Sequence, residues 1–253
     1  MAKHYNLNGK IAVVTGAGSG IGREVALVLA EEGAELSLMD LNQEGLAGTL
    51  RQLKEGQYSG DTYALNISDP DAVSQAFDQI KGKWSKIDIL VTCAGIMSSE
   101  RTWDISPESW KRVLDVNLMG TFLAVRCALK LMRKQKYGKI ITIGSDVGKR
   151  GGGRMADSAY AASKGGVLAF TRTVAREVAL DGISVNCVNP GPTRTPMHDD
   201  TPEEKIQLMR SGIPKGRLGK PRDIANAVAF LVSELAEHIH GETLNVDGGV
   251  MMD

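Results

Sequence analysis

Short apolar runs alternate with longer amphipathic segments along almost the whole chain. The short runs are rich in Val, Ile and Leu and predict buried strands at residues 10–15, 34–39, 60–65, 87–91, 138–144, 183–189 and 243–246. Between them, apolar residues recur three and four positions apart, which predicts helices at residues 23–32, 42–55, 68–84, 106–134, 159–178 and 222–233. Strands that alternate with helices favour a parallel sheet covered by helices on both faces.

No linker, repeat or low-complexity tract interrupts this alternation. We therefore expect residues 1–253 to form a single α/β domain with a doubly wound parallel sheet of about seven strands. Ligands of such sheets bind outside the carboxyl ends of the strands. Polar residues or glycines follow most of the predicted strands at this edge: Gly16, Asp40, Asn66, Gly95, Ser145 and Asn189. Their arrangement predicts one shared crevice.

A glycine-rich turn, Gly16-Ala-Gly-Ser-Gly-Ile-Gly22, joins the first strand to the first helix. Strand, glycine turn and helix form the context of a Rossmann-like dinucleotide site, because glycines let the backbone approach a pyrophosphate whose charge the helix start attracts. Asp40 ends the second strand about 20 residues later, where a carboxylate binds the ribose hydroxyls of NAD and repels the 2′-phosphate of NADP. We therefore predict NAD as the cofactor. The alternative for Asp40 is an ordinary carboxylate that heads a turn.

Tyr160 and Lys164 lie four residues apart at the start of a predicted helix, so both side chains share one face. A nearby ammonium favours the phenolate, and we expect Lys164 to lower the pKa of Tyr160 from its usual value of about 10. Such a pair is a proton-transfer device. Taken alone, it is equally compatible with two surface residues on an amphipathic helix.

Composition excludes several classes of function. Thirty basic residues balance thirty acidic ones without long blocks of either sign, which argues against binding to nucleic acid or to an anionic membrane. No apolar run reaches the roughly 18 residues of a membrane span, and the first residues lack the apolar core of a signal peptide, so we expect a cytoplasmic protein. The cysteines (Cys93, Cys127 and Cys187) and the four histidines are scattered, which indicates neither a disulfide framework nor a metal site.

Together, these motifs resemble the short-chain dehydrogenase/reductase family in its compact single-domain form. The resemblance extends from Gly9 to Gly249. It rests on Thr15-Gly16-x-x-x-Gly20-Ile-Gly22, Ala94-Gly95, Asn117, Ser145, Tyr160-x-x-x-Lys164, Asn189-Pro190-Gly191 with Thr195, and Val246-Asp247-Gly248-Gly249. Each motif is weak or moderate alone, but their order and spacing are specific.

The resemblance implies a role for each motif residue. Tyr160 would be the acid/base, Lys164 would lower its pKa and bind the nicotinamide ribose, and Ser145 would hold the substrate oxygen. Asn117 would support a water-linked proton relay; the alternative is an amide that only satisfies buried backbone groups. Cofactor contacts are implied for Gly16, Ser19, Gly20, Ile21, Gly22, Asp40, Asn66, Ile67, Ala94, Gly95, Tyr160, Lys164, Pro190, Gly191, Thr193 and Thr195. The family also implies a homotetramer.

The sequence departs from the family pattern at three places. Cys93 replaces an asparagine before Ala94, so we expect looser bonding at that strand end, and Asn66 stands where an aspartate often meets the adenine. The interval between Ser145 and Tyr160 is long, and its extra residues include Lys149, Arg150 and Arg154, which could receive an anionic substrate; the alternative is a solvated glycine-rich loop. Residues 192–216 are expected to form a short helical lid.

The leading interpretation is an NAD-dependent oxidoreductase that transfers a hydride between the cofactor and a small secondary alcohol or ketone, with polyols and hydroxy acids among the candidates. The alternative is a 3-oxoacyl-thioester (acyl carrier protein) reductase of the fatty-acid type, an enzyme that would usually use NADPH. A remote alternative is a non-catalytic NAD-binding regulator. The presence of Asn117, Ser145, Tyr160 and Lys164 argues against that last possibility.

Overall fold

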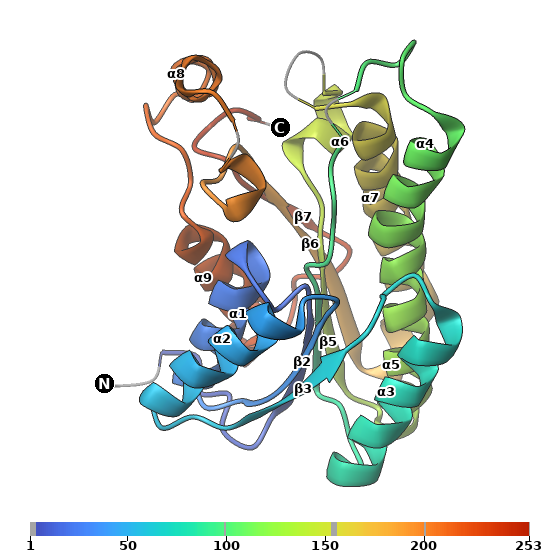
Figure 1. Ribbon diagram of the computed structural model, residues 1–253. Helices are drawn as coiled ribbons and strands as arrows, with labels where there is room; N and C mark the ends of the chain where they lie inside the picture. Colours follow the sequence, from blue (N-terminus) through green and yellow to red (C-terminus); the bar gives the residue numbers. More distant parts are fainter. Residues whose placement is uncertain (1–3, 99, 153–155, 200, 253) are drawn as a thin grey trace.

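A seven-stranded parallel sheet forms the centre of the computed structural model, which describes residues 4–98, 100–152, 156–199 and 201–252 (Figure 1). The strand order is β3-β2-β1-β4-β5-β6-β7. The strands are β1 (Ile11–Thr15), β2 (Glu35–Asp40), β3 (Gly60–Ala64), β4 (Ile89–Thr92), β5 (Gly138–Ile143), β6 (Ile183–Pro190) and β7 (Thr243–Val246). All are paired in parallel, which confirms the predicted doubly wound sheet.

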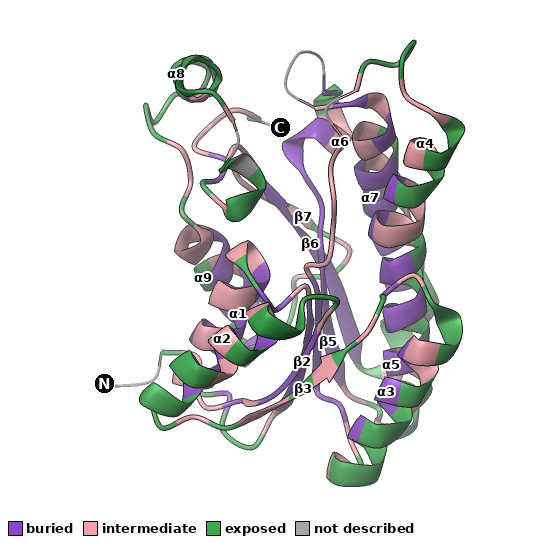
Figure 2. Cartoon of the chain, viewed as in Figure 1, coloured by how far each residue is buried: buried purple, intermediate pink, exposed green. Residues whose placement is uncertain are grey.

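Helices cover both faces of this sheet (Figure 1). One layer consists of α1 (Gly20–Glu31), α2 (Gln43–Glu55) and α9 (Pro221–Val232), and the other of α3 (Pro70–Trp84), α4 (Pro107–Leu114), α5 (Gly120–Gln135) and α7 (Ser158–Val178). Two shorter helices, α6 (Asp146–Arg150) and α8 (Glu203–Ser211), lie above the carboxyl ends of the strands. The central strands are buried along their whole length because each is covered twice, as Figure 2 shows.

The helix starts follow from side-chain capping. Asn42, Asp69, Ser106 and Asp157 each stand directly before a helix, and a side-chain oxygen of each accepts a hydrogen bond from a backbone N–H of the first turn. These bonds satisfy N–H groups that have no partner inside the helix, which fixes where each helix begins.

The long helix predicted at residues 106–134 contains one π-helical turn. Asp115–Met119 joins α4 to α5, and the backbone N–H of Gly120 donates to the carbonyl of Asp115, five residues earlier. Thr121 Oγ1 donates to the carbonyl of Asn117 at 2.8 Å. The wide turn lets α4 continue into α5 without a break, and Asn117 lies within it.

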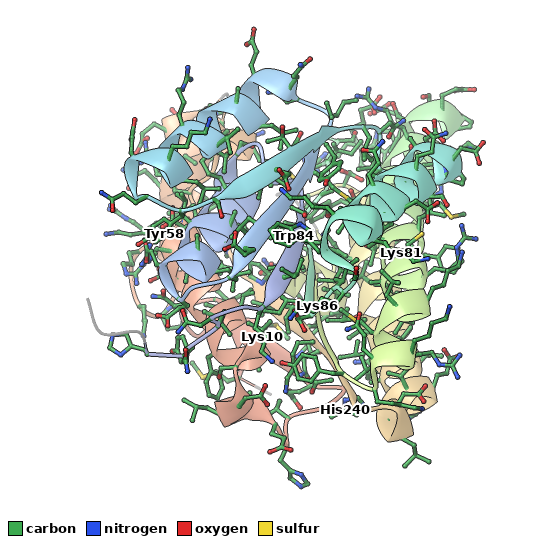
Figure 3. The ribbon with its side chains drawn as sticks, turned by 90° about the horizontal axis from the view of Figure 1, so that it is seen from below. Lys10, Tyr58, Lys81, Trp84, Lys86 and His240 are labelled. Carbon is green, nitrogen blue, oxygen red and sulfur yellow. The ribbon has the colours of Figure 1, made fainter. Side chains whose placement is uncertain are left out.

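Charged and polar side chains close the amino-terminal ends of the strands. Lys10 Nζ donates to the Tyr137 hydroxyl at 2.7 Å, and that hydroxyl donates to Glu234 at 2.9 Å. The Lys86 ammonium lies 2.8 Å from the Asp88 carboxylate. Figure 3 views this end and labels Lys10 and Lys86 beneath the sheet. The opposite, carboxyl end of the sheet is therefore the open one. Among the described residues, no helix is long and apolar enough to cross a bilayer.

Candidate active site

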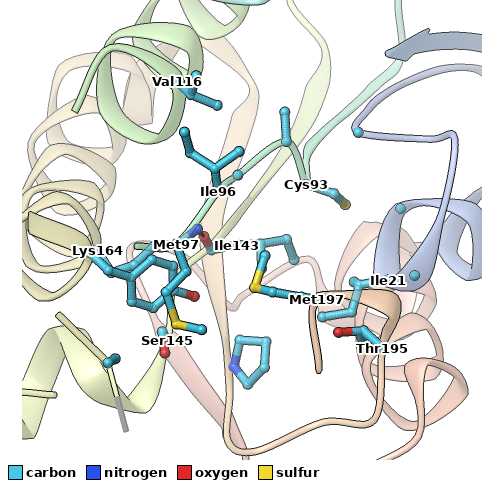
Figure 4. A pocket seen from close by; sticks show the side chains of 18 of the residues that line it. Ile21, Cys93, Ile96, Met97, Val116, Ile143, Ser145, Lys164, Thr195 and Met197 are labelled. Atoms are coloured by element: carbon cyan, nitrogen blue, oxygen red, sulfur yellow. Dashed lines mark hydrogen bonds between the residues drawn. The ribbon is translucent and has the colours of Figure 1, made fainter. Parts of the chain in front are cut away.

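A cleft of about 960 Å³ opens at the carboxyl ends of the strands. Each residue for which the sequence implied a cofactor contact lines it, from Gly16 after β1 to Thr195 beyond β6, and Ser145 lines it as well. Figure 4 shows Ser145, Lys164 and Met97 on one side, with Ile21, Thr195 and Met197 across from them. The strand ends thus meet at one crevice, as predicted.

The glycine turn after β1 has no room for a side chain at Gly16 or Gly22. Gly16 has a φ of 67°, and a Cβ there would lie 2.7 Å from the backbone of Ala94. A Cβ on Gly22 would lie 2.1 Å from the carbonyl oxygen of Gly16. Ser19, the residue before α1, makes no side-chain capping hydrogen bond, so the first N–H groups of this helix can receive an anion. The pyrophosphate of a dinucleotide fits this turn.

The Asp40 carboxylate accepts hydrogen bonds from the backbone around it. One oxygen accepts from Gly18 N–H and the other from Asn42 N–H, both at 2.8 Å. These contacts are those of a carboxylate that heads a turn, the alternative considered for this residue. Its negative charge is partly compensated by the two donors, and its oxygens are engaged without any ribose.

The candidate catalytic residues come from two neighbouring elements. Ser145 follows β5, and Tyr160 and Lys164 lie on the first two turns of α7. The Tyr160 phenol is hydrogen-bonded to the Ser145 side chain. Lys164 is only 4% exposed, and its amine donates to the carbonyl of Ile143 at 2.8 Å while lying 5.8 Å from the centre of the Tyr160 ring.

Burial dominates the ionisation of this group. It raises the pKa of Tyr160 to about 12; the hydrogen bond with Ser145 lowers that pKa in part, and the Asp146 and Asp157 carboxylates raise it. Burial also lowers the pKa of Lys164 to about 8. The prediction that Lys164 lowers the pKa of Tyr160 is therefore wrong for the free protein, because desolvation of the phenol dominates and the amine is directed at the Ile143 carbonyl. At neutral pH the phenol is a proton donor.

Asn117 is fully buried behind the wall of the cleft. Its Oδ1 accepts from Ile96 N–H at 2.8 Å, and its Nδ2 donates to the Ile96 carbonyl and to Ser163 Oγ, both at 2.9 Å. These contacts match the alternative in which the amide satisfies buried backbone groups. The relay role stays a prediction.

Residues at the departures from the family pattern have defined surroundings. Cys93 N–H donates to the Thr15 carbonyl at 3.2 Å, so this strand end stays bonded through its backbone. Burial raises the pKa of the Cys93 thiol to about 12, which keeps it protonated. The side-chain oxygen of Asn66, Oδ1, accepts from Ser68 N–H at 3.1 Å and from the Ser68 hydroxyl at 2.9 Å.

Asp146 is a site residue that sequence reasoning missed. It is 3% exposed, lines the cleft, and its Oδ1 accepts a hydrogen bond from the Ser145 hydroxyl at 3.2 Å. Arg150 Nε donates to the other oxygen at 2.9 Å, so this candidate anion receptor is already ion-paired. The i, i+4 spacing of Asp146 and Arg150 was the available signal. Arg154, the other arginine of the proposed anion site, lies outside the described residues.

The segment predicted as a lid supplies an apolar wall. Eight residues of this segment line the cleft, and two of them, Leu208 and Met209, come from α8; the others are Pro192, Thr193, Thr195, Pro196, Met197 and Gly212. Met97 and Val147 face the same space from the far side. Whether this segment moves remains a prediction.

Comparison with known proteins places the chain among reductases. A family model described as "Enoyl-(Acyl carrier protein) reductase" matches residues 16–251. The 3-oxoacyl-acyl-carrier-protein reductase of Escherichia coli (strain K12) is 39% identical over 247 residues, which cover 98% of this chain and 99% of that protein. The human (3R)-3-hydroxyacyl-CoA dehydrogenase is 39% identical over 97% of each chain. A solved 3-oxoacyl-acyl-carrier-protein reductase from Brucella melitensis is 31% identical, with a TM-score of 0.93 over 98% of this chain and 93% of that one.

These relatives correct the cofactor prediction. The 3-oxoacyl-acyl-carrier-protein reductases among them belong to the class for which we expected NADPH, so the prediction of NAD is wrong. The Asp40 carboxylate is not free to accept from a ribose, because both of its oxygens accept hydrogen bonds from backbone N–H groups.

The match covers nearly the whole chain in sequence and in structure, and the motif residues gather at one cleft. The chain therefore belongs to the short-chain dehydrogenase/reductase family and is an oxidoreductase that acts on a CH–OH or keto group.

Proposed function

We propose that this protein is an NADPH-dependent reductase of 3-oxoacyl thioesters, which it converts to 3-hydroxyacyl thioesters. The observation that carries the proposal is a proton-donating phenol, bonded to Ser145, at the base of a cleft whose outer wall is apolar. The relatives that are 39% identical over nearly the full chain include reductases with this substrate class in their names.

Three residues of the cleft have separate roles in this reaction. Tyr160 donates its phenolic proton to the carbonyl oxygen of the substrate, because a group with a pKa of about 12 is protonated at neutral pH. The Ser145 hydroxyl orients that oxygen and stabilises its developing charge. Lys164 holds an amine beneath the site that is mostly protonated at neutral pH. When bound, NADPH supplies the hydride.

The wall above this pair favours an acyl chain over a polyol. Met97, Met197, Leu208 and Met209 line the cleft and offer no strong hydrogen-bonding group. A polyol would leave hydroxyls without partners there, which costs free energy, whereas an aliphatic chain gains from burial. The small-alcohol interpretation of the sequence is therefore less well supported than its thioester alternative.

A substrate comparison tests the proposal. NADPH oxidation is followed with 3-oxoacyl thioesters of short and medium chain length, and with small ketones of similar reactivity. We expect the thioesters to have the higher kcat/KM, and NADPH to be preferred over NADH. A protein that reduces small ketones but no thioester would contradict the proposal.

Tyr160→Phe supplies the mechanistic test. The substitution removes the proton but keeps the ring, so we expect kcat to fall by about 10²–10⁴-fold. NADPH binding, measured by fluorescence titration, should remain near that of the wild type. Retention of full turnover by the Phe variant would refute the assigned role.

The homotetramer implied by the family remains a prediction. Phe122 and Phe170 stack edge to face on α5 and α7, and Phe122 and Met119 are partly exposed. Light scattering at micromolar concentration tests the oligomeric state.

A further inference from the structure

A single buried carboxylate joins two walls of the cleft. Asp157, which is 6% exposed, stands directly before α7, and its Oδ1 accepts from Tyr160 N–H at 2.7 Å. Its other oxygen, Oδ2, accepts from Ser98 N–H at 2.8 Å. Ser98 belongs to the segment after β4, which is 59 residues away in sequence. Asp157 therefore has two separate tasks, one for each oxygen.

The segment after β4 is held at two points. Asn117 bonds both backbone groups of Ile96, and Asp157 bonds Ser98. Met97 lies between these points, lines the cleft, and faces the reacting end beside Ser145 and Lys164 (Figure 4). Since a residue between two fixed neighbours has little backbone freedom, the position of the Met97 side chain depends on both attachments.

We propose that Asp157 is a positioning residue, which holds the segment after β4 to the start of α7 and thereby fixes Met97 as a wall of the substrate site. Asp157 does not line the cleft, so it acts through Met97 and through the first turn of α7. The use of a thioester substrate in the test rests on the proposed function.

Asparagine separates the two tasks of Asp157. It caps helices about as well as aspartate, but its amide has one acceptor oxygen, and its NH₂ group only donates. Asp157→Asn has one acceptor for the two N–H groups, and when its oxygen keeps the cap on Tyr160 N–H, the acceptor for Ser98 N–H is lost. Asp157→Ala loses both. Asp69 is the matched control, because its carboxylate caps α3 through Asp71 N–H and Ala72 N–H and does not line the cleft.

The kinetic experiment uses the full-length protein at pH 7, well below the pKa of Tyr160, so that the phenol is protonated in each variant. We expect Asp157→Asn to raise KM for the 3-oxoacyl thioester about fivefold while kcat stays within about twofold, because binding contacts shift and the proton donor stays. Asp157→Ala should also lower the melting temperature. Asp69→Asn and Asp69→Ala should leave KM unchanged.

Hydrogen exchange supplies a readout that needs no activity. The Ser98 amide should exchange faster in Asp157→Asn than in the wild type, whereas the Ile96 amide, bonded to Asn117, serves as the internal reference. Wild-type KM and unchanged Ser98 exchange in Asp157→Asn would overturn the proposal, as would an equal rise in KM for Asp69→Asn. If the wild type reduces no thioester, the proposed function fails, and Ser98 exchange still decides the role of Asp157.

Discussion

Replacing Lys164 with methionine should remove activity and yet stabilise the folded protein at neutral pH. Burial lowers the pKa of this lysine from 10.5 to about 8. At about 1.4 kcal/mol per pKa unit, the buried ammonium costs about 3 kcal/mol of folding free energy at pH 7. Methionine removes that cost and also removes the hydrogen bond to the Ile143 carbonyl, a loss of about 1–2 kcal/mol. The variant should therefore be about 1 kcal/mol more stable.

The pH dependence of this difference is the sharper test. As pH rises from 8 towards 10.5, the folded protein releases the Lys164 proton before the unfolded chain does, so the wild type gains stability relative to the variant. The cost of the ammonium falls from about 3 kcal/mol at pH 7 to about 2 kcal/mol at pH 9. The advantage of Lys164→Met should therefore shrink or vanish at pH 9.

The assay is urea unfolding of both proteins without cofactor at pH 7 and pH 9, followed by circular dichroism. Lys54→Met, at an exposed position on α2, controls for the exchange of lysine for methionine. A stability difference that is the same at both pH values would refute the reasoning. So would a variant several kcal/mol less stable than the wild type at pH 7.

Two further predictions concern carboxylates of the cleft. Asp146→Asn should lower the pKa of Tyr160, because the Asp146 carboxylate disfavours the phenolate; the pH profile of alcohol oxidation with NADP⁺, which needs the deprotonated phenol, should then shift to lower pH. An unchanged profile would contradict this. Asp40→Asn should lower KM for NADPH roughly fivefold, since about 1 kcal/mol of like-charge repulsion with the 2′-phosphate is removed; titration of NADPH checks it, and a higher KM would contradict it.

Most of the fold could be predicted from the sequence. Strands buried on both faces give continuous apolar runs, and β1 and β5 begin and end within one residue of their predicted bounds. The convergence of Gly16, Gly95 and Ser145 at one edge followed from the parallel topology. The short helix α6 was missed, because its five residues are too few to show a periodicity.

The electrostatics of the site could not be predicted in the same way. The spacing of Tyr160 and Lys164 gave their shared helix face, but it gave neither the direction of the Lys164 amine nor the desolvation of the phenol. For Asp40, the sequence gave the strand end but not the backbone donors that occupy the carboxylate. Both errors concern which groups a side chain forms hydrogen bonds with, and tertiary contacts decide that.

The π-helical turn at Asp115–Met119 makes the reading frame of one helix a determinant of the cleft. A deletion of one residue in this turn would restore an ordinary α-helix, because the wide turn accommodates one extra residue, and would remove the bulge in which Asn117 lies. The apolar face of α5 could stay packed against the sheet, while Asn117 would lose its hydrogen bonds to Ile96. Such a deletion should yield a protein that folds but whose active-site wall lacks support. A change of length in this turn should therefore reduce activity more than it reduces stability.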